Sequence, residues 1–170
     1  MSIYDKALKG LLRKCSILHF KDYGEFKKKV STLSNDEIEW LKELSKTNSY
    51  AQFNLGYMYR HGLGVDKDLK EAVRLFGLSA GQGYSFAQLH LGCLYKKGLG
   101  VEKDYKEAVR LFRLSADQCN QYAQCNLGYM YHYCLGVEKD YKEAVRLYRL
   151  SADQGYSEAQ NNLNRLSNNL

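Results

Sequence analysis

The side chains best suited to metal binding or catalysis are scattered cysteines and histidines. The candidate metal ligands are Cys93, Cys125, His90 and His132. No recognised ligand spacing links them, and zinc sites usually show such a spacing. The sequence contains no G-x-S-x-G segment, phosphate-binding loop or zinc-protease motif. It therefore predicts a non-enzymatic protein that needs neither a metal nor a cofactor.

A second group of polar residues recurs at a fixed interval and has a structural explanation. Asp68 and Glu71 stand in the spacing of a helix N-terminal capping pattern. Glu71 and Arg74 stand in the spacing of an ion pair on a helix surface. Both patterns recur in the two following repeats. We interpret them as caps and surface pairs, because an active site needs unlike groups at one place.

Aromatic and basic residues form a further pattern, with the i, i+3 and i+7 spacing that places them on one face of a helix. Aromatic residues exceed what a solvated face requires, and Tyr and Arg often dominate the binding energy of protein interfaces. With neighbouring polar side chains, this face gives the predicted partner-binding groove: Phe53, Asn54, Tyr57, Arg60, His61, Leu89, His90, Lys96, Lys97, Asn126, Tyr129, His132 and Tyr133. The alternative is that several of these rings pack between helices as core.

A row of glutamines accompanies this face. Its members are Gln52, Gln88, Gln124 and Gln160. Their amides could bond the backbone of an extended peptide, or they could bond each other and neighbouring loops. The sequence leaves both alternatives open.

All these patterns follow an internal repeat of 36 residues without insertion. The sequence AQFNLGYMYRHGLGVDKD begins at Ala51, similar stretches begin at Ala87 and Ala123, and a shorter one begins at Ala159. Periods of this length are typical of proteins that stack one supersecondary unit on the next. The sequence therefore predicts an all-α solenoid.

Each repeat is predicted to form two helices joined by a glycine-containing turn. Gly56 lies on the apolar face of the first helix, where its missing side chain lets a neighbouring helix approach. Gly62 and Gly64 are expected to end this helix. The core positions of the first repeat are Ala51, Leu55, Met58 and Tyr59 in the first helix and Leu69, Ala72, Val73, Phe76 and Ala80 in the second.

The ends of the chain depart from the repeat, as terminal units of a solenoid must. Residues 1–48 are predicted to be a helical segment with a degenerate capping repeat, because Ser34 and Glu37 form an S-x-x-E capping box. Residues 49–156 hold the three repeats, and residues 157–170 form a polar C-terminal capping helix. A further amphipathic helix is expected over residues 3–15.

The repeats resemble the Sel-1-like repeat family, relatives of the tetratricopeptide repeat. The resemblance rests on A-x-x-x-L-G-x-x-Y, then G-x-G-V, then K-D-x-x-E-A, and covers residues 49–166. It implies a right-handed superhelix whose first helices line a concave groove, and a role as an adaptor or scaffold. Cys119 and Cys134 depart from the family pattern, because they stand where the other repeats have cap glycines.

Composition favours a reduced, intracellular protein. The chain has five cysteines, no C-x-x-C pair and no proline. We expect a cytoplasmic location, which would be the host cytoplasm for a chain of viral or intracellular-bacterial origin. The net charge of +6 is mild and spread along the sequence, which indicates solubility rather than nucleic-acid binding. No stretch predicts a membrane span or a signal peptide.

The predicted function is to bind another protein, through a neutral to acidic peptide or helix in the groove, because Arg60, Lys96 and Lys97 are the charges of this face. A monomer is favoured. The alternative is a regulatory or assembly subunit that binds through its unique N-terminal segment, around Lys27, Lys28 and Lys29, with the repeats as spacer.

Overall fold

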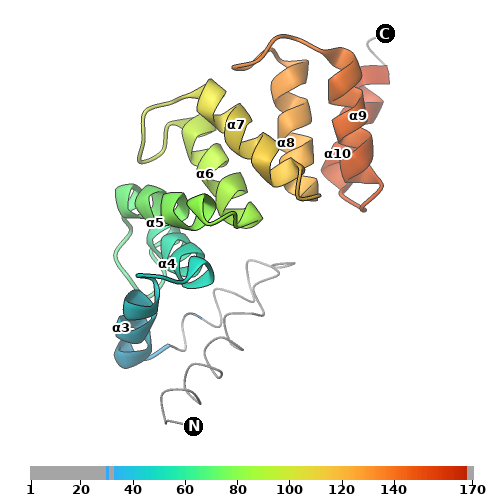
Figure 1. The fold of residues 1–170 in the computed structure, drawn as a ribbon. Helices are drawn as coiled ribbons and strands as arrows, with labels where there is room; N and C mark the ends of the chain where they lie inside the picture. Colours follow the sequence, from blue (N-terminus) through green and yellow to red (C-terminus); the bar gives the residue numbers. More distant parts are fainter. Residues whose placement is uncertain (1–29, 31–32, 168–170) are drawn as a thin grey trace. The chain divides into compact units, whose positions relative to one another are not determined.

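The computed structural model describes residue 30 and residues 33–167, and helices are the regular structure of these residues (Figure 1). The helices are α3 (Asn35–Leu44), α4 (Ser49–His61), α5 (Leu69–Gly81), α6 (Ser85–Lys97), α7 (Tyr105–Ala116), α8 (Gln121–His132), α9 (Tyr141–Ala152) and α10 (Ser157–Ser167). The amphipathic helix expected over residues 3–15 lies outside the described residues.

The chain divides into two compact parts between Ser79 and Ala80. The N-terminal part contains α3, α4 and most of α5, and the C-terminal part contains α6 to α10. Within the C-terminal part, each helix packs on the next one along the chain, so that α8, α9 and α10 lie side by side (Figure 1). The predicted all-α solenoid of helix–turn–helix repeats is confirmed.

Helix boundaries follow from the predicted caps. The Asp104 carboxylate accepts a hydrogen bond from the backbone N–H of Glu107 at 3.0 Å, and Asp68 and Asp140 cap α5 and α9 in the same way. Each such bond satisfies a backbone donor that the helix leaves unpaired. At the other end, α4 terminates at Gly62, whose φ of 66° is the left-handed conformation that glycine adopts without a steric penalty.

The glycines on the first helices mark close packing against second helices. A Cβ atom added at Gly92 would lie 2.7 Å from the Phe112 ring, and one at Gly128 would lie 3.0 Å from the Tyr148 ring. These distances are shorter than ordinary van der Waals contacts. At Gly56, for which the sequence predicted such an approach, an added Cβ would lie 3.1 Å from the Phe76 ring, so that prediction is confirmed.

A buried serine near the end of a second helix forms a hydrogen bond with the first residue of the preceding first helix. The Ser115 hydroxyl donates to the Ser85 carbonyl oxygen at 2.8 Å, and Ser151 donates to the Gln121 carbonyl at the same distance. Both serine side chains are fully buried. Because a buried hydroxyl without a partner is costly, this bond explains how a polar side chain is accommodated in the core.

Candidate functional site

Part of the predicted groove is core rather than surface. Phe53, Asn54, Tyr57 and Leu89 are all more than nine-tenths buried, so they do not form the exposed surface expected from the sequence. In α4 every residue from Ala51 to Met58 is buried, which means that this helix is covered on all sides. The periodicity of a helix that is apolar on one face therefore does not apply there.

The contacts of two of these side chains show why they are buried. The Phe53 ring lies 5.6 Å from the Phe76 ring of α5, measured between centroids. Leu89 belongs to a core cluster that includes Val109 and Phe112 of α7. Both side chains thus pack between helices, as the alternative interpretation of the sequence pattern had it.

The last turn of α4 holds two further residues of the predicted groove, Arg60 and His61, both half-buried. Burial, with smaller effects from Arg60 and Lys67, lowers the pKa of His61 to about 4. The imidazole is therefore neutral near pH 7. Its ring lies 4.3 Å from that of Tyr57, so His61 contributes an aromatic contact rather than a charge.

The remaining groove residues lie in the C-terminal part, where Lys96 bridges α6 and α8. Its Nζ atom donates to Oδ1 of Asn126 at 2.7 Å. The ammonium group also lies 5.3 Å from the centroid of the Tyr129 ring and 5.7 Å from that of Phe112. These contacts hold a positive charge at a defined place beside an exposed ring. Lys97, the next residue, is exposed, and His90 is half-buried.

Beyond Lys96, four rings at the end of α8 and the start of α9 form a chain of contacts, which we call the tyrosine cluster: Tyr129, His132, Tyr133 and Tyr141. The ring centroids of Tyr129 and Tyr133 lie 4.4 Å apart, and His132 stacks on Tyr133 at 4.2 Å. The ring of Tyr141, from the first turn of α9, lies 5.6 Å from His132. The three tyrosines are 37%, 50% and 43% exposed, in chain order. They form an aromatic surface continuous with Lys96.

Two members of this neighbourhood were not predicted. Lys139 lies in the turn before α9 and Tyr141 is the first residue of α9, whereas the predicted groove lies on first helices alone. The Lys139 Nζ atom lies 4.6 Å from the Tyr141 ring centroid. Burial and the Lys139 charge lower the pKa of His132, which favours a neutral imidazole. The sequence signal that could have identified Lys139 and Tyr141 is the K-D-Y segment, which recurs at the start of two second helices.

Below this surface, Cys125 is buried between α8 and α10. The Asn162 amide contacts the Cys125 sulfur at 3.6 Å. Burial, followed by the nearby Glu158 carboxylate, raises the pKa of the thiol to about 11. The thiol is therefore protonated at neutral pH, whereas the thiolate is the nucleophilic form of cysteine.

Glutamines of the row form hydrogen bonds within the fold. The side-chain amide of Gln118 donates to Oε1 of Gln88 at 2.9 Å, and Gln154 donates to Gln124 at 2.7 Å. Gln88 also donates to the Ala80 carbonyl at 3.3 Å. These bonds join the end of each second helix to a first helix. Of the two alternatives, bonding to neighbouring structural elements is the one observed.

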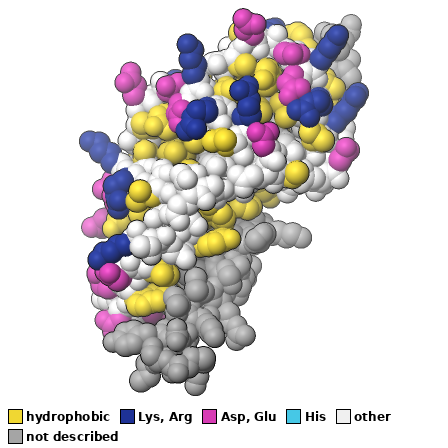
Figure 2. All heavy atoms as spheres, viewed as in Figure 1, with side chains coloured by type: hydrophobic (Ala, Val, Ile, Leu, Met, Phe, Trp, Pro, Cys, Tyr) yellow, Lys and Arg dark blue, Asp and Glu magenta, His cyan; other side chains and the backbone are white. Residues whose placement is uncertain are grey.

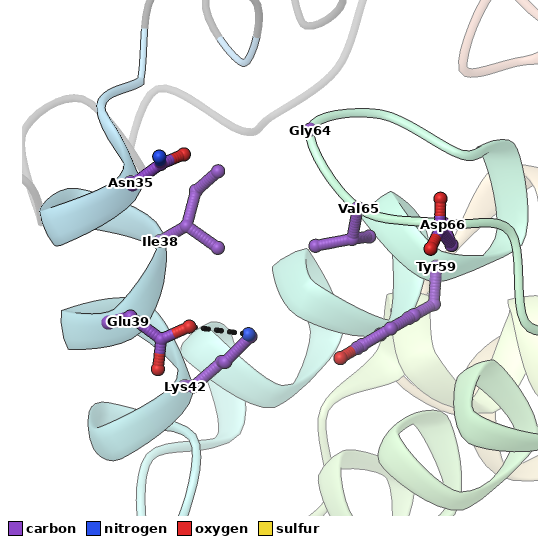
Figure 3. Close-up of a pocket in the computed structure, with 8 residues that line it drawn as sticks. All are labelled: Asn35, Ile38, Glu39, Lys42, Tyr59, Gly64, Val65 and Asp66. Atoms are coloured by element: carbon purple, nitrogen blue, oxygen red, sulfur yellow. Dashed lines mark hydrogen bonds and ion pairs between the residues drawn. The ribbon is translucent and has the colours of Figure 1, made fainter.

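The N-terminal part contains a pocket of about 340 Å³ that the sequence did not predict (Figure 3). It lies between α3 and the end of α4 with its following turn, and its lining residues are Asn35, Ile38, Glu39, Lys42, Tyr59, Gly64, Val65 and Asp66. Glu39 and Lys42 form an ion pair at 2.6 Å across one wall, and this hydrogen bond raises the pKa of Lys42. The wall is thus internally neutralised.

Charges on the surface are mixed in sign. Figure 2 shows Lys and Arg side chains interspersed with Asp and Glu over the C-terminal part, with hydrophobic patches between them. Recurring pairs contribute to this pattern, as in Glu107 and Arg110 at 2.7 Å. Among residues 30 and 33–167, no three His, Cys, Asp or Glu side chains converge as a metal site would require. None of the described helices has both the length and the apolar character needed to cross a bilayer.

Comparison with known proteins identifies the repeat. The model of the Sel1 repeat matches residues 49–84, 85–118 and 121–156. The chain belongs to the Sel1 repeat family. Sel1 repeat proteins are generally protein-interaction modules built on a non-catalytic repeat scaffold. This agrees with the family resemblance found in the sequence.

Individual relatives cover different portions of the chain. Human protein sel-1 homolog 2 is 54% identical over 33 residues, which are 19% of this chain and 5% of that protein. A Sel1 repeat protein from Oxalobacter formigenes is 32% identical with a TM-score of 0.71, over 94% of this chain and 58% of that one. A protective antigen of uropathogenic Escherichia coli strains, which displays an SLR fold, is 31% identical with a TM-score of 0.71, over 75% and 28%.

A more distant structure shares the fold alone. Cysteine rich protein B of Helicobacter pylori is 19% identical with a TM-score of 0.59, over 79% of this chain and 95% of that one. The first three relatives are longer than the chain, which spans 5%, 58% and 28% of their lengths in the order given.

Proposed function

We propose that this Sel1 repeat protein is a non-enzymatic scaffold that binds a neutral to acidic segment of another protein. The binding surface is the face of α6 and α8 around Lys96, Asn126 and Tyr129. The proposal uses only residues of the C-terminal part, because the predicted groove residues Phe53, Asn54 and Tyr57 of α4 are buried.

The observation that carries the proposal is the exposed tyrosine beside a fixed ammonium group. Tyr129 is 37% exposed, and Lys96 is held 5.3 Å from its ring by the bond to Asn126. A positioned cation next to a large apolar ring suits a partner segment that offers both a carboxylate and an apolar side chain. The positive charge of Lys97 and the overall charge of +6 favour the same partner.

The test is affinity purification with mass spectrometry, followed by titration of the purified partner against variants. Tyr129→Ala should weaken binding by about 1–3 kcal/mol, as the loss of an interface aromatic anchor does. Lys96→Ala should mainly slow association, and added salt should reduce that effect. Lys106→Ala is the control, because Lys106 is exposed on α7.

The opposite ranking would exclude the proposal. If Lys106→Ala weakens binding while Tyr129→Ala leaves it unchanged, and melting curves show both variants folded, the partner binds on the outer helices. The N-terminal alternative is tested in the full chain by replacing Lys27, Lys28 and Lys29 with serine. These lysines lie outside the described residues, and loss of binding in that variant alone would favour the alternative.

A further inference from the structure

The tyrosine cluster extends beyond the face just described and differs from its counterparts in the other repeats. We infer that it is the main anchor of the partner and that it takes an extended, acidic, proline-containing segment of another protein. This inference rests on the proposed function and specifies the chemistry of the partner. It adds Tyr133, Tyr141 and Lys139 to the binding surface.

The third repeat exposes this group of rings, whereas the equivalent pair of the first repeat, Tyr57 and His61, is buried and half-buried. Tyr133 occupies the position of Lys97 in the second repeat and of His61 in the first, and Tyr129 occupies that of Cys93 in the second. Tyr133 is half exposed although its ring contacts two others. Contiguous exposed aromatic area of this kind marks interaction surfaces, and tyrosine is among the residues that carry most of the binding energy.

The ring spacings determine what shape of ligand fits. His132 stacks on Tyr133 with an interplanar angle of 19° and a centroid distance of 4.2 Å. This distance leaves no slot into which a further ring could insert, since aromatic pairs keep their centroids about 4.5–7 Å apart. The ring of Tyr148 supports the cluster from below, 6.4 Å from His132 and itself fully buried. The Tyr129 and Tyr133 rings are tilted by 41°, and the Tyr141 ring stands at 61° to His132. The ligand must therefore lie across an uneven aromatic platform rather than insert between two rings.

The charges around the platform favour an acidic ligand. Lys96 lies against the Tyr129 ring, and Lys139 lies against the Tyr141 ring. Of the nearby carboxylates, Asp140 caps α9 through the N–H of Glu143. Glu143 itself pairs with Arg146 at 2.7 Å, and Glu138 on the turn is exposed. Two ammonium groups thus lie against the rings themselves, whereas Glu138 and Asp140 flank Lys139 in the chain and keep their charge. The two ammonium groups complement carboxylates of a partner.

Proline residues in the partner would suit both the aromatic platform and the need to lose little conformational entropy on binding. A polyproline II segment is extended before binding and loses little conformational entropy, which is why aromatic-lined surfaces recognise it. The 170 residues contain no proline, so the proline-containing segment is not one of them. Carboxylates spaced among the prolines would reach the ammonium groups at the border of the platform.

The experiment uses the full chain and defined probes, with fluorescence anisotropy as the readout. The probes are a labelled peptide of repeated Pro-Pro-Asp, the same peptide with Lys for Asp, the same peptide with Ala for Pro, and oligo-dT. We expect the Pro-Pro-Asp peptide to bind most tightly. Tyr133→Ala, Tyr133→Ser and Tyr141→Ala should each weaken its binding by about tenfold or more. Tyr133→Ser removes the ring, adds no charge and keeps the site solvated.

The control is Leu150→Ala, because Leu150 is 40% exposed on α9 and Tyr141 of the same helix is 43% exposed. The inference is overturned if the Pro-Pro-Asp peptide does not bind, if the alanine or lysine peptide or oligo-dT binds as well, or if the cluster variants bind like the wild type. A partner whose binding needs Lys96 and Tyr129 but neither Tyr133 nor Tyr141 would exclude the inference alone. A partner that needs none of them would exclude the proposed function too.

Discussion

The turn after α8 and the turn after α4 occupy equivalent places in the repeat but meet different neighbours. A Cβ atom added at Gly136, after α8, would lie 2.4 Å from the backbone of Tyr105 in α7. The equivalent atom at Gly64, after α4, would meet the tip of the Ile38 side chain at 3.2 Å. Beside Gly64 there is the pocket next to α3 (Figure 3). The turn after α8 therefore packs backbone to backbone on α7. The turn after α4 instead leaves space between itself and α3.

The largest expected effect is at this pair of glycines. Gly136→Ala should destabilise the protein by about 2–5 kcal/mol, because it adds a backbone clash to the cost of a positive φ. Gly64→Ala should cost about 1–2 kcal/mol, because it has the same sign of φ but faces a movable side chain. Urea unfolding of the two variants measures the difference. Equal losses would contradict the conclusion that the two turns are packed differently.

Glycines that contact a ring of the neighbouring helix should show the same ranking of stability losses, with a smaller difference between the C-terminal and N-terminal parts. A Cβ at Gly92 would lie 2.7 Å from Phe112 in the C-terminal part, against 3.1 Å between Gly56 and Phe76 in the N-terminal part. Gly92→Ala should therefore cost about 1–3 kcal/mol, and Gly56→Ala should cost less. Gly77→Ala is the control, because a Cβ atom added there would have no neighbouring atom within 4 Å. Alanine at this position should therefore stabilise the helix by about 0.5–1 kcal/mol. Destabilisation by Gly77→Ala would show that these distances do not govern the outcome.

The fold could be predicted from the sequence because its causes are local and repeated. The capping acid before each second helix and the glycine on each first helix have the same structural role in every repeat where they occur. Gly56, Gly92 and Gly128 could be assigned to helix packing from their register alone. The capping box expected at Ser34 and Glu37 is also complete in the structure, at the start of α3.

The candidate site was predicted less well because exposure depends on tertiary packing. Phe53 and Tyr129 stand on the same stripe of their helices, yet the first is buried and the second is 37% exposed. The stripe gives the direction of a side chain and says nothing of what covers it. Tyr141 was missed for a related reason, since it reaches the platform from a different helix.

The third prediction concerns two cysteines that stand where other repeats have glycine. Cys119 and Cys134 have φ values of 60° and 57°, which is a strained conformation for a residue with a Cβ. Cys134→Gly should stabilise the protein by about 1 kcal/mol by removing this strain, less the entropic cost of glycine in the unfolded chain. Cys119→Gly should act in the same direction. Thermal or urea unfolding under reducing conditions measures both, and a destabilised Cys134→Gly variant would mean that the thiol makes a stabilising contact that outweighs the strain.

The smallest expected effect is a pH dependence of stability to which His61 of α4 and His132 of α8 both contribute. The pKa of His61 is lowered to about 4, below its ordinary value near 6.5. Between these values the unfolded chain binds a proton that the folded chain does not, so stability present above about pH 6.5 is lost as the pH falls towards 4. His61→Gln should remove this contribution, and its melting temperature should decline less than that of the wild type between pH 7 and pH 5. His132→Gln should change the profile in the same direction, because burial and Lys139 lower the pKa of that histidine too. Superimposable pH profiles of His61→Gln and the wild type would show that the His61 imidazole is solvated rather than packed on Tyr57.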